Sequence, residues 1–185
     1  FLECDHMILK YIPYAELDYD EYCASGITVK EEYSRVIIPS MLDNKKIVAA
    51  TGLYVDEINN QISYYLEELI VEEGIKFLQV HCENCPHLKK ISLPYSMLFL
   101  NCEFSNCKNL EEADLPDNIE YLGWSIFEDC EKLEFIQLPL SLKAIDGWAF
   151  CHSGLKTIVI PSGTKIIYDK AFKECGNLKT VVLPK

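Results

Sequence analysis

The sequence predicts a mainly β protein, a solenoid built from units of 22–23 residues that each contribute a short parallel strand. The first observation is a ten-residue pattern that superimposes without gaps in five places: CPHLKKISLP (85–94), CKNLEEADLP (107–116), CEKLEFIQLP (130–139), HSGLKTIVIP (152–161) and CGNLKTVVLP (175–184). The second is its spacing, because the closing prolines follow one another at intervals of 22, 23, 22 and 23 residues. A fixed period of this length is typical of solenoids, in which each unit contacts only its neighbours.

The pattern within each unit predicts a strand that ends at a proline and is followed by turns. Apolar residues alternate with polar ones near the end of the pattern, which is the period of a strand with one buried face. Proline then stops the strand, since it lacks the amide that a further ladder bond needs. Apolar residues three and six positions after the proline predict a second short extended piece. Segments such as AFKEC (171–175) predict a helical turn.

Two columns of equivalent residues predict the core. One column contains phenylalanines and the other leucines: Phe104, Phe127, Phe150 and Phe172, and Leu88, Leu110, Leu133, Leu155 and Leu178. A single unit could not bury either column, so we expect stacking of the units to create the core.

The predicted repeat domain covers residues 33–185. Two weaker copies, YSRVIIP (33–39) and LEELIVE (66–72), precede the five clear ones. The spacing between them is larger than one period, and we therefore expect a surface insertion near residues 55–65.

Residues 1–32 do not fit the repeat and are rich in tyrosine and acidic residues. We expect them to form an N-terminal cap, because the first unit would otherwise expose its apolar end. At the other end the chain stops directly after a strand, at Lys185. A longer chain or an end-to-end contact between copies could cover that edge, so self-association is a further expectation.

This pattern resembles the BspA-like leucine-rich repeats, whose units read approximately L-x-x-I-x-(L/I)-P-x-x-(L/V)-x-x-I-G-x-x-A-F-x-x-C. The resemblance is most literal over residues 107–184 and is traceable from 33 to 184. The chain departs from the family pattern where Glu72 replaces proline and Cys82 stands in the phenylalanine column. The resemblance implies a bacterial protein that is secreted or attached to the cell surface and has an adhesion-type role. A cytoplasmic location is the alternative.

Composition and charge exclude several classes of function. The formal net charge of −12 argues against nucleic acid as a partner, because no basic stripe could displace phosphate counterions. No run approaches the eighteen or more apolar residues of a membrane span. The catalytic motifs G-x-S-x-G, H-E-x-x-H and G-x-x-x-x-G-K-[ST] are absent from the sequence. We therefore expect no enzyme activity and no cofactor.

The segment VHCENCPH (80–87) offers the alternative function, a metal or thiol-redox site. His81, Cys82, Cys85 and His87 supply thiols and imidazoles, which zinc prefers as ligands. However, a single C-x-x-C lacks the second pair of a zinc knuckle, and no βαβ pattern surrounds it.

The repeat provides a simpler explanation of these cysteines. Cys85 begins a column with Cys107, Cys130 and Cys175, in which His152 takes the place of the cysteine in the fourth unit. We expect this column to lie in the turn before the strand, where a weak S–H donor can face neighbouring carbonyls. Nine cysteines cannot all pair internally, and we expect a ladder of free thiols.

The outward positions of the strands predict the binding surface, because they line one continuous face. The candidates are Ile70, Lys90, Glu112, Asp114, Phe135, Gln137, Thr157, Val159 and Val182. Phe135 and the two valines are apolar where solvent alone would favour polar groups, so another protein or a host or matrix surface is the expected partner. For the valines, the preference of β-branched residues for strands is an equally good explanation.

Overall fold

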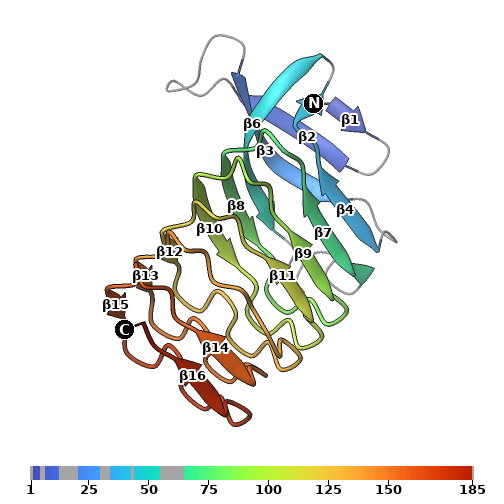
Figure 1. Cartoon of the computed structure of the whole chain (residues 1–185). Coiled ribbons are helices and arrows are strands. Elements are labelled where there is room, and N and C mark those ends of the chain that lie inside the picture. The colour runs from blue at the N-terminus through green and yellow to red at the C-terminus, as the bar shows by residue number, and fades with distance from the viewer. Residues whose placement is uncertain are drawn as a thin grey trace.

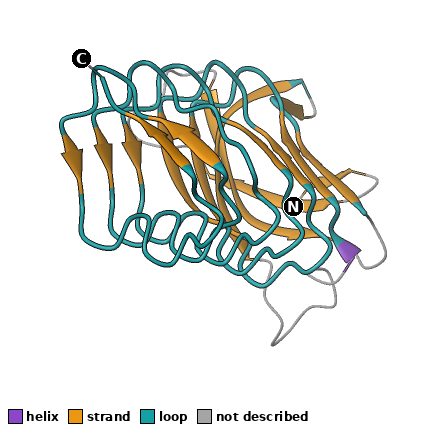
Figure 2. Cartoon of the chain, turned by 60° about the horizontal axis from the view of Figure 1, so that its bottom comes forward, coloured by secondary structure: helices purple, strands orange, loops and turns teal. Residues whose placement is uncertain are grey.

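The computed structural model describes residues 2–4, 7–12, 21–29, 34–42, 44–54 and 65–184. Successive units stack along one axis and form two sheets joined by turns (Figures 1 and 2). The predicted β solenoid with short parallel strands is confirmed. Among the described residues, no helix has the length and apolar character needed to cross a membrane.

The strands that end at the prolines form the front sheet. Its first part has the order β11-β9-β7-β4 and all its pairs are parallel, and its second part pairs β14 with β16. The bounds are β4 (Arg35–Ile38), β7 (Glu68–Val71), β9 (Lys90–Ser92), β11 (Glu112–Asp114), β14 (Thr157–Val159) and β16 (Thr180–Val182). The predicted alternation is present, since inward residues such as Val36, Leu69 and Ile158 are buried while their neighbours are not.

The extended pieces after the prolines form the back sheet, also as predicted. β6 (Lys45–Tyr54), β8 (Phe77–His81) and β10 (Phe99–Glu103) pair in parallel, as do β12 (Tyr121–Leu122), β13 (Ala144–Ile145) and β15 (Ile166–Ile167). From β8 onward each strand is short, because the turns on both sides take up most of the 22–23 residues of a unit.

The N-terminal segment extends the back sheet with longer strands. β1 (Leu2–Cys4) and β2 (Met7–Ile12) are antiparallel, β2 pairs antiparallel with β3 (Glu21–Val29), and β3 pairs in parallel with β6. A short strand, β5 (Met41–Leu42), pairs antiparallel with β6. The capping role of residues 1–32 stays a prediction. The expected insertion at 55–65 lies outside the described residues except for Tyr65.

The two predicted columns form the core between the sheets. Phe104, Phe127 and Phe150 are almost completely buried, and consecutive rings, Phe172 included, stack with centroid distances of 6.0, 5.6 and 5.4 Å. Every leucine of the second column is fully buried except Leu178 in the last unit. Since each residue meets its equivalent in the next unit, one cluster runs through the stack from Val36 to Ala171.

The turns stack as well and form a continuous ladder of their own, visible as the row of loops in Figure 2. Amides of one unit donate to carbonyls of the next, as Asn84 N does to Ser105 O (3.0 Å) and Asp129 N to Cys151 O (2.9 Å). The predicted helical turns are single hydrogen-bonded turns that contain residues with positive φ. The column before the cysteines is left-handed throughout: Asn84, Asn106, Asp129, His152 and Glu174 have φ between 55° and 57°.

This conformation corrects one position of the sequence alignment. His152 was expected in the cysteine column, but its φ of 56° and the bond from its amide to Lys173 O (2.9 Å) place it one position earlier. Ser153 therefore takes the place of the cysteine and is buried, while His152 is exposed. The fourth unit is one residue shorter than its neighbours. The missing residue falls after Ser153, where Gly154 passes close to the preceding unit.

Candidate functional site

All nine predicted binding residues lie at outward positions of the front sheet or of residues 135–137, which continue it. Phe135, Val159 and Val182 are 60%, 51% and 45% exposed, whereas Ile70, Lys90 and Thr157 are half-buried. The inward neighbours Ile136 and Ile158 are buried, as the alternation requires. In β16 the inward residue Val181 is also 51% exposed, because in the described structure a neighbouring unit covers it from one side only. The expected end-to-end contact at this edge stays a prediction.

The ladder of the front sheet is interrupted at the unit that carries Phe135. In the preceding units, the amide of an outward residue donates to the previous unit, as Lys90 N does to Glu67 O (3.2 Å) and Glu112 N to Lys89 O (3.0 Å). Within the described part of the chain, no backbone bond joins residues 134–138 to β11, and these residues form no strand. We call the space between β11 and residues 134–138 the ladder gap.

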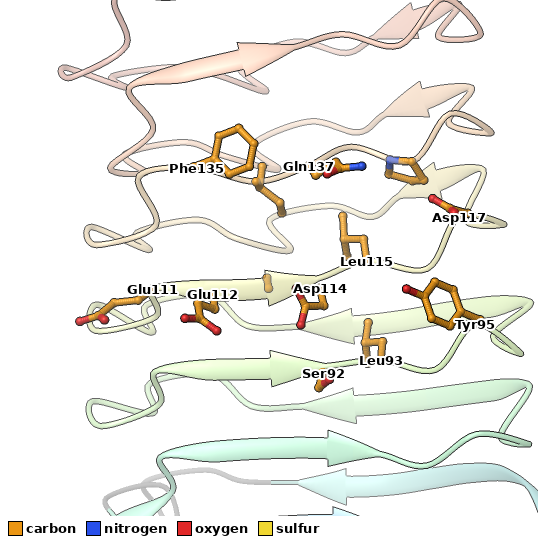
Figure 3. A pocket seen from close by; sticks show the side chains of 13 residues that line it. Ser92, Leu93, Tyr95, Glu111, Glu112, Asp114, Leu115, Asp117, Phe135 and Gln137 are labelled. Carbon is orange, nitrogen blue, oxygen red and sulfur yellow. The ribbon is translucent and has the colours of Figure 1, made fainter.

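An open pocket of about 570 Å³ occupies the ladder gap (Figure 3). Its lining comes from three consecutive units: Ser92, Leu93, Tyr95, Glu111, Glu112, Ala113, Asp114, Leu115, Asp117, Phe135, Ile136, Gln137 and Pro139. A second hollow of about 290 Å³ shares Glu111 and Phe135 with it. Phe135 lies on the segment across the gap from β11, and Tyr95 and Asp117 lie at one end (Figure 3).

A small residue accounts for the unfilled floor of this pocket. The central inward position of the front strands holds Val36, Leu69, Ile91, Ile136 and Ile158 in other units, and all of these are buried. In β11 the same position holds Ala113, which is only half-buried. Ala113 is the one signal in the sequence that could have indicated the gap, and it was not among the predicted site residues.

The pocket is acidic. Glu111, Glu112, Asp114 and Asp117 contribute carboxylates to its lining. Lys90 Nζ pairs with Glu112 Oε2 at 2.5 Å, and this hydrogen bond, followed by the charge of Glu112, raises the pKa of Lys90. Lys132 Nζ lies 4.0 Å from Glu111 Oε1. In the described structure, Asp114 and Asp117 take part in no ion pair.

The structure does not bring the four residues of the alternative metal site together. Cys82 and Cys85 are fully buried and point into the core, whereas His87 is exposed. His81 Nδ1 instead contacts Glu103 Oε2 of the next unit at 3.2 Å. Among the described residues, the one group whose ligand atoms lie close enough for a metal ion is His81, Glu83 and Glu103, within 4.8 Å of one another.

The cysteine column has the geometry expected of weak S–H donors. Cys107 Sγ lies 3.0 Å from Cys82 O, Cys130 Sγ 3.3 Å from Phe104 O, and Cys175 Sγ 2.9 Å from Phe150 O. Each acceptor is the carbonyl of the phenylalanine-column residue one unit earlier. Seven cysteines of the repeat units are free thiols: Cys82, Cys85, Cys102, Cys107, Cys130, Cys151 and Cys175.

Burial works against redox chemistry at the C-x-x-C. A hydrogen bond with Cys85 lowers the pKa of Cys82, but burial and the neighbours Cys107 and Cys102 outweigh it, so the net pKa is raised. A nucleophilic or redox-active thiol needs the opposite shift, toward the thiolate.

Several bacterial leucine-rich repeat proteins of known structure share this fold. A leucine rich cell surface protein from Faecalibacterium prausnitzii superimposes with a TM-score of 0.60 at 17% identity, over 98% of this chain and 55% of that chain. The pneumococcal vaccine antigen PcpA gives 0.61 at 19% identity, over 98% and 48%. A leucine rich repeat protein of T. pallidum gives 0.52 at 20% identity, over 94% and 67%. The chain thus spans about half the length of the first two structures.

At the level of sequence, no curated protein matches the chain. Residues 75–185 match the BspA type leucine rich repeat region in six copies, which is more than half of the chain. The match covers the five clear units and confirms the resemblance inferred from their pattern. The chain belongs to the BspA-type leucine-rich repeat family.

Proposed function

We propose that this chain is a non-enzymatic module that binds another protein through the outward face of its front sheet. The observation that carries the proposal is Phe135, an aromatic side chain 60% exposed at the edge of an acidic pocket, in the middle of that face. Large apolar groups beside a hollow are typical anchors of protein interfaces.

The rest of the face supports the same function. Val159 and Val182 continue an apolar stripe from Phe135, and Lys90, Glu112 and Asp114 form a polar region on the other side. An apolar centre with a polar surround is the usual composition of a protein interface. The solenoid holds these side chains in fixed register where strands pair, as Lys90 does with Glu112 and Val159 with Val182.

We propose a secreted or cell-surface setting and an adhesion-type role. Support comes from the family and from the fold shared with a protein described as a bacterial cell surface protein and with a vaccine antigen. Another protein or a host or matrix surface would then be the partner.

The test is selection of a random-peptide phage library on the immobilised 185-residue chain. Enriched clones should bind the double variant Phe135→Glu/Val159→Glu at least about tenfold more weakly, as expected when central anchors of an interface are lost. The matched control is Tyr121→Glu, which changes an aromatic residue of similar exposure (62%) on the back sheet. Circular dichroism and thermal melting should be unchanged in both variants. Clones that bind both variants equally well would overturn the proposed face.

A further inference from the structure

We propose that the ladder gap is a receptor for an arginine side chain presented by the protein partner. The inference rests on the proposed function, because the gap lies in the middle of the proposed binding face. It adds the chemistry that this face recognises.

The first argument is an unused hydrogen-bond acceptor at the edge of β11. Glu67 O and Lys89 O, at the same position in two earlier units, each accept two amides from the next unit, at donor–acceptor distances of 2.8–3.2 Å. Glu111 O is their equivalent and accepts no backbone amide in the described part of the chain. Since successive carbonyls of a strand point to opposite sides, the carbonyl of Ala113 also points into the gap. Main-chain carbonyls without a partner favour a ligand rich in donors.

The second argument is charge. The pocket lining carries four carboxylates, and two ammonium groups, those of Lys90 and Lys132, are close enough to pair with them. The formal balance is −4 + 2 = −2, and Asp114 and Asp117 are the carboxylates left over. A cationic group fits this pocket, whereas a second copy of a chain with net charge −12 does not.

The spacing of the carboxylates favours an organic cation over a metal ion. The carboxylates of the gap are not among the groups whose ligand atoms lie close together in the described structure. They are spread along a pocket of about 570 Å³, a size within the range of roughly 300–1,000 Å³ that is usual for small-ligand sites. A planar guanidinium with five donors can reach several separated acceptors, which a compact ammonium cannot do to the same degree.

The aromatic wall provides a further contact for a guanidinium. Phe135 is 60% and Tyr95 72% exposed, and both line the pocket (Figure 3). Arginine stacks on aromatic faces while its edge donates hydrogen bonds. The gap thus combines free carbonyls, unpaired carboxylates and aromatic surface around an unfilled floor at Ala113.

The probe is the peptide acetyl-Gly-Val-Arg-Val-Gly-amide, titrated into the isotope-labelled 185-residue chain and followed by NMR. Saturable shifts should centre on the amides of residues 111–115 and 135–137 and should weaken with added salt. Replacing arginine by citrulline, its uncharged analogue, should weaken binding about tenfold or more, because charge-assisted hydrogen bonds are lost. Lysine should bind more weakly than arginine. No saturable binding, shifts elsewhere on the chain, or equal binding of the citrulline or lysine peptide would overturn the proposal.

Two variants of the protein test the pocket itself. Ala113→Ile installs the residue that other units carry and fills the floor, so it should abolish binding of the arginine peptide without loss of stability. Asp114→Asn/Asp117→Asn should weaken binding about tenfold, and the matched control Glu128→Gln/Asp169→Asn should not. Phage clones that still need Phe135 but are indifferent to Ala113→Ile would overturn the arginine pocket and leave the proposed function standing. Clones indifferent to both would overturn both.

Discussion

At the scale of the residue, one glycine sets the geometry of the fourth turn. The unit after Pro139 is shortened between Ser153 and Leu155, and the chain there passes directly over the preceding turn. Gly154 N donates to Cys130 O at 3.0 Å, and a Cβ on Gly154 would lie 2.0 Å from Glu131 O. No rotamer change could relieve this contact, because the opposing atom belongs to the backbone.

Gly154→Ala should therefore destabilise the protein. We expect the free energy of unfolding to fall by about 1–3 kcal/mol, the usual cost of forcing extra volume into a packed site. Urea denaturation followed by circular dichroism measures the change. Gly176→Ala is the matched control, because nothing lies within 4 Å of a Cβ at that glycine. Equal effects of the two substitutions would show that the close approach at Glu131 is not what requires glycine.

Also at the scale of the residue, the thiols have a structural role. The S–H groups of Cys107, Cys130 and Cys175 donate to carbonyls of the preceding unit. Ser153 keeps a polar hydrogen at the position where the fourth unit has no cysteine. Its Oγ lies 3.5 Å from Cys175 Sγ. The repeat therefore accounts for both cysteines of VHCENCPH, because Cys85 lies in the cysteine column and Cys82 in the phenylalanine column.

At the scale of the element, the stacked phenylalanines hold the turns of neighbouring units together. Consecutive rings from Phe104 to Phe172 stack, with interplanar angles of 15°, 21° and 4° along the column. Phe150 has a ring on both sides and is fully buried. Phe172 has a ring on one side and is half-buried.

Truncation within this column should depend on position. Phe150→Ala should cost about 3–5 kcal/mol of unfolding free energy, as is usual for a buried aromatic residue. Phe172→Ala should cost clearly less, because part of its surface is already in water. Chemical denaturation of both variants gives the comparison. A larger loss at Phe172 than at Phe150 would contradict the stacked-core account.

At the scale of the whole molecule, we expect the buried thiols to make the free energy of unfolding fall at alkaline pH. The pKa values of six described cysteines are raised above the ordinary value of 9.0, and the raised set is Cys82, Cys102, Cys107, Cys130, Cys151 and Cys175. Burial is the main cause for Cys102 and Cys130, and a hydrogen bond with Cys85, followed by burial, is the cause for Cys107.

The free energy of unfolding should keep its full value below the pKa of the thiols in the unfolded chain. It should fall as the pH rises beyond about 9. The unfolded chain then releases protons that the folded chain retains, and each thiol contributes up to about 1.4 kcal/mol per pH unit. Unfolding free energies measured between pH 7.5 and 10.5 test this. Cys130→Ala should reduce the slope of unfolding free energy against pH by the contribution of one thiol. A flat profile over this range would contradict the raised pKa values.

The ladder gap opens where both sheets of the solenoid are divided. The ladder of turns and the aromatic core continue through the unit of Phe135, whereas the front ladder stops at β11. The back sheet is also divided in this region, between β10 and β12. The units are thus held together along the turns while both sheets part, and a pocket forms on the front face.

The sequence by itself determined the period, the core columns and the alternation of the front strands before β16. These features repeat, and a repeat has only one way to bury its apolar columns, which is to stack. The sequence also determined which side chains face outward, including Phe135. It did not determine the position of His152, because a shortened turn can lose its residue at several points and only the backbone conformation distinguishes them.

Only the tertiary structure decided that β11 and residues 134–138 do not pair. Hydrogen bonds between units depend on how closely the side chains between the sheets let the strands approach, and that is a sum over several contacting units. The smaller volume of Ala113 is visible in the sequence, but its consequence depends on the residues of the units above and below it. The predicted binding face is therefore a property of the repeat, whereas the pocket within it arises from the packing of one particular pair of units.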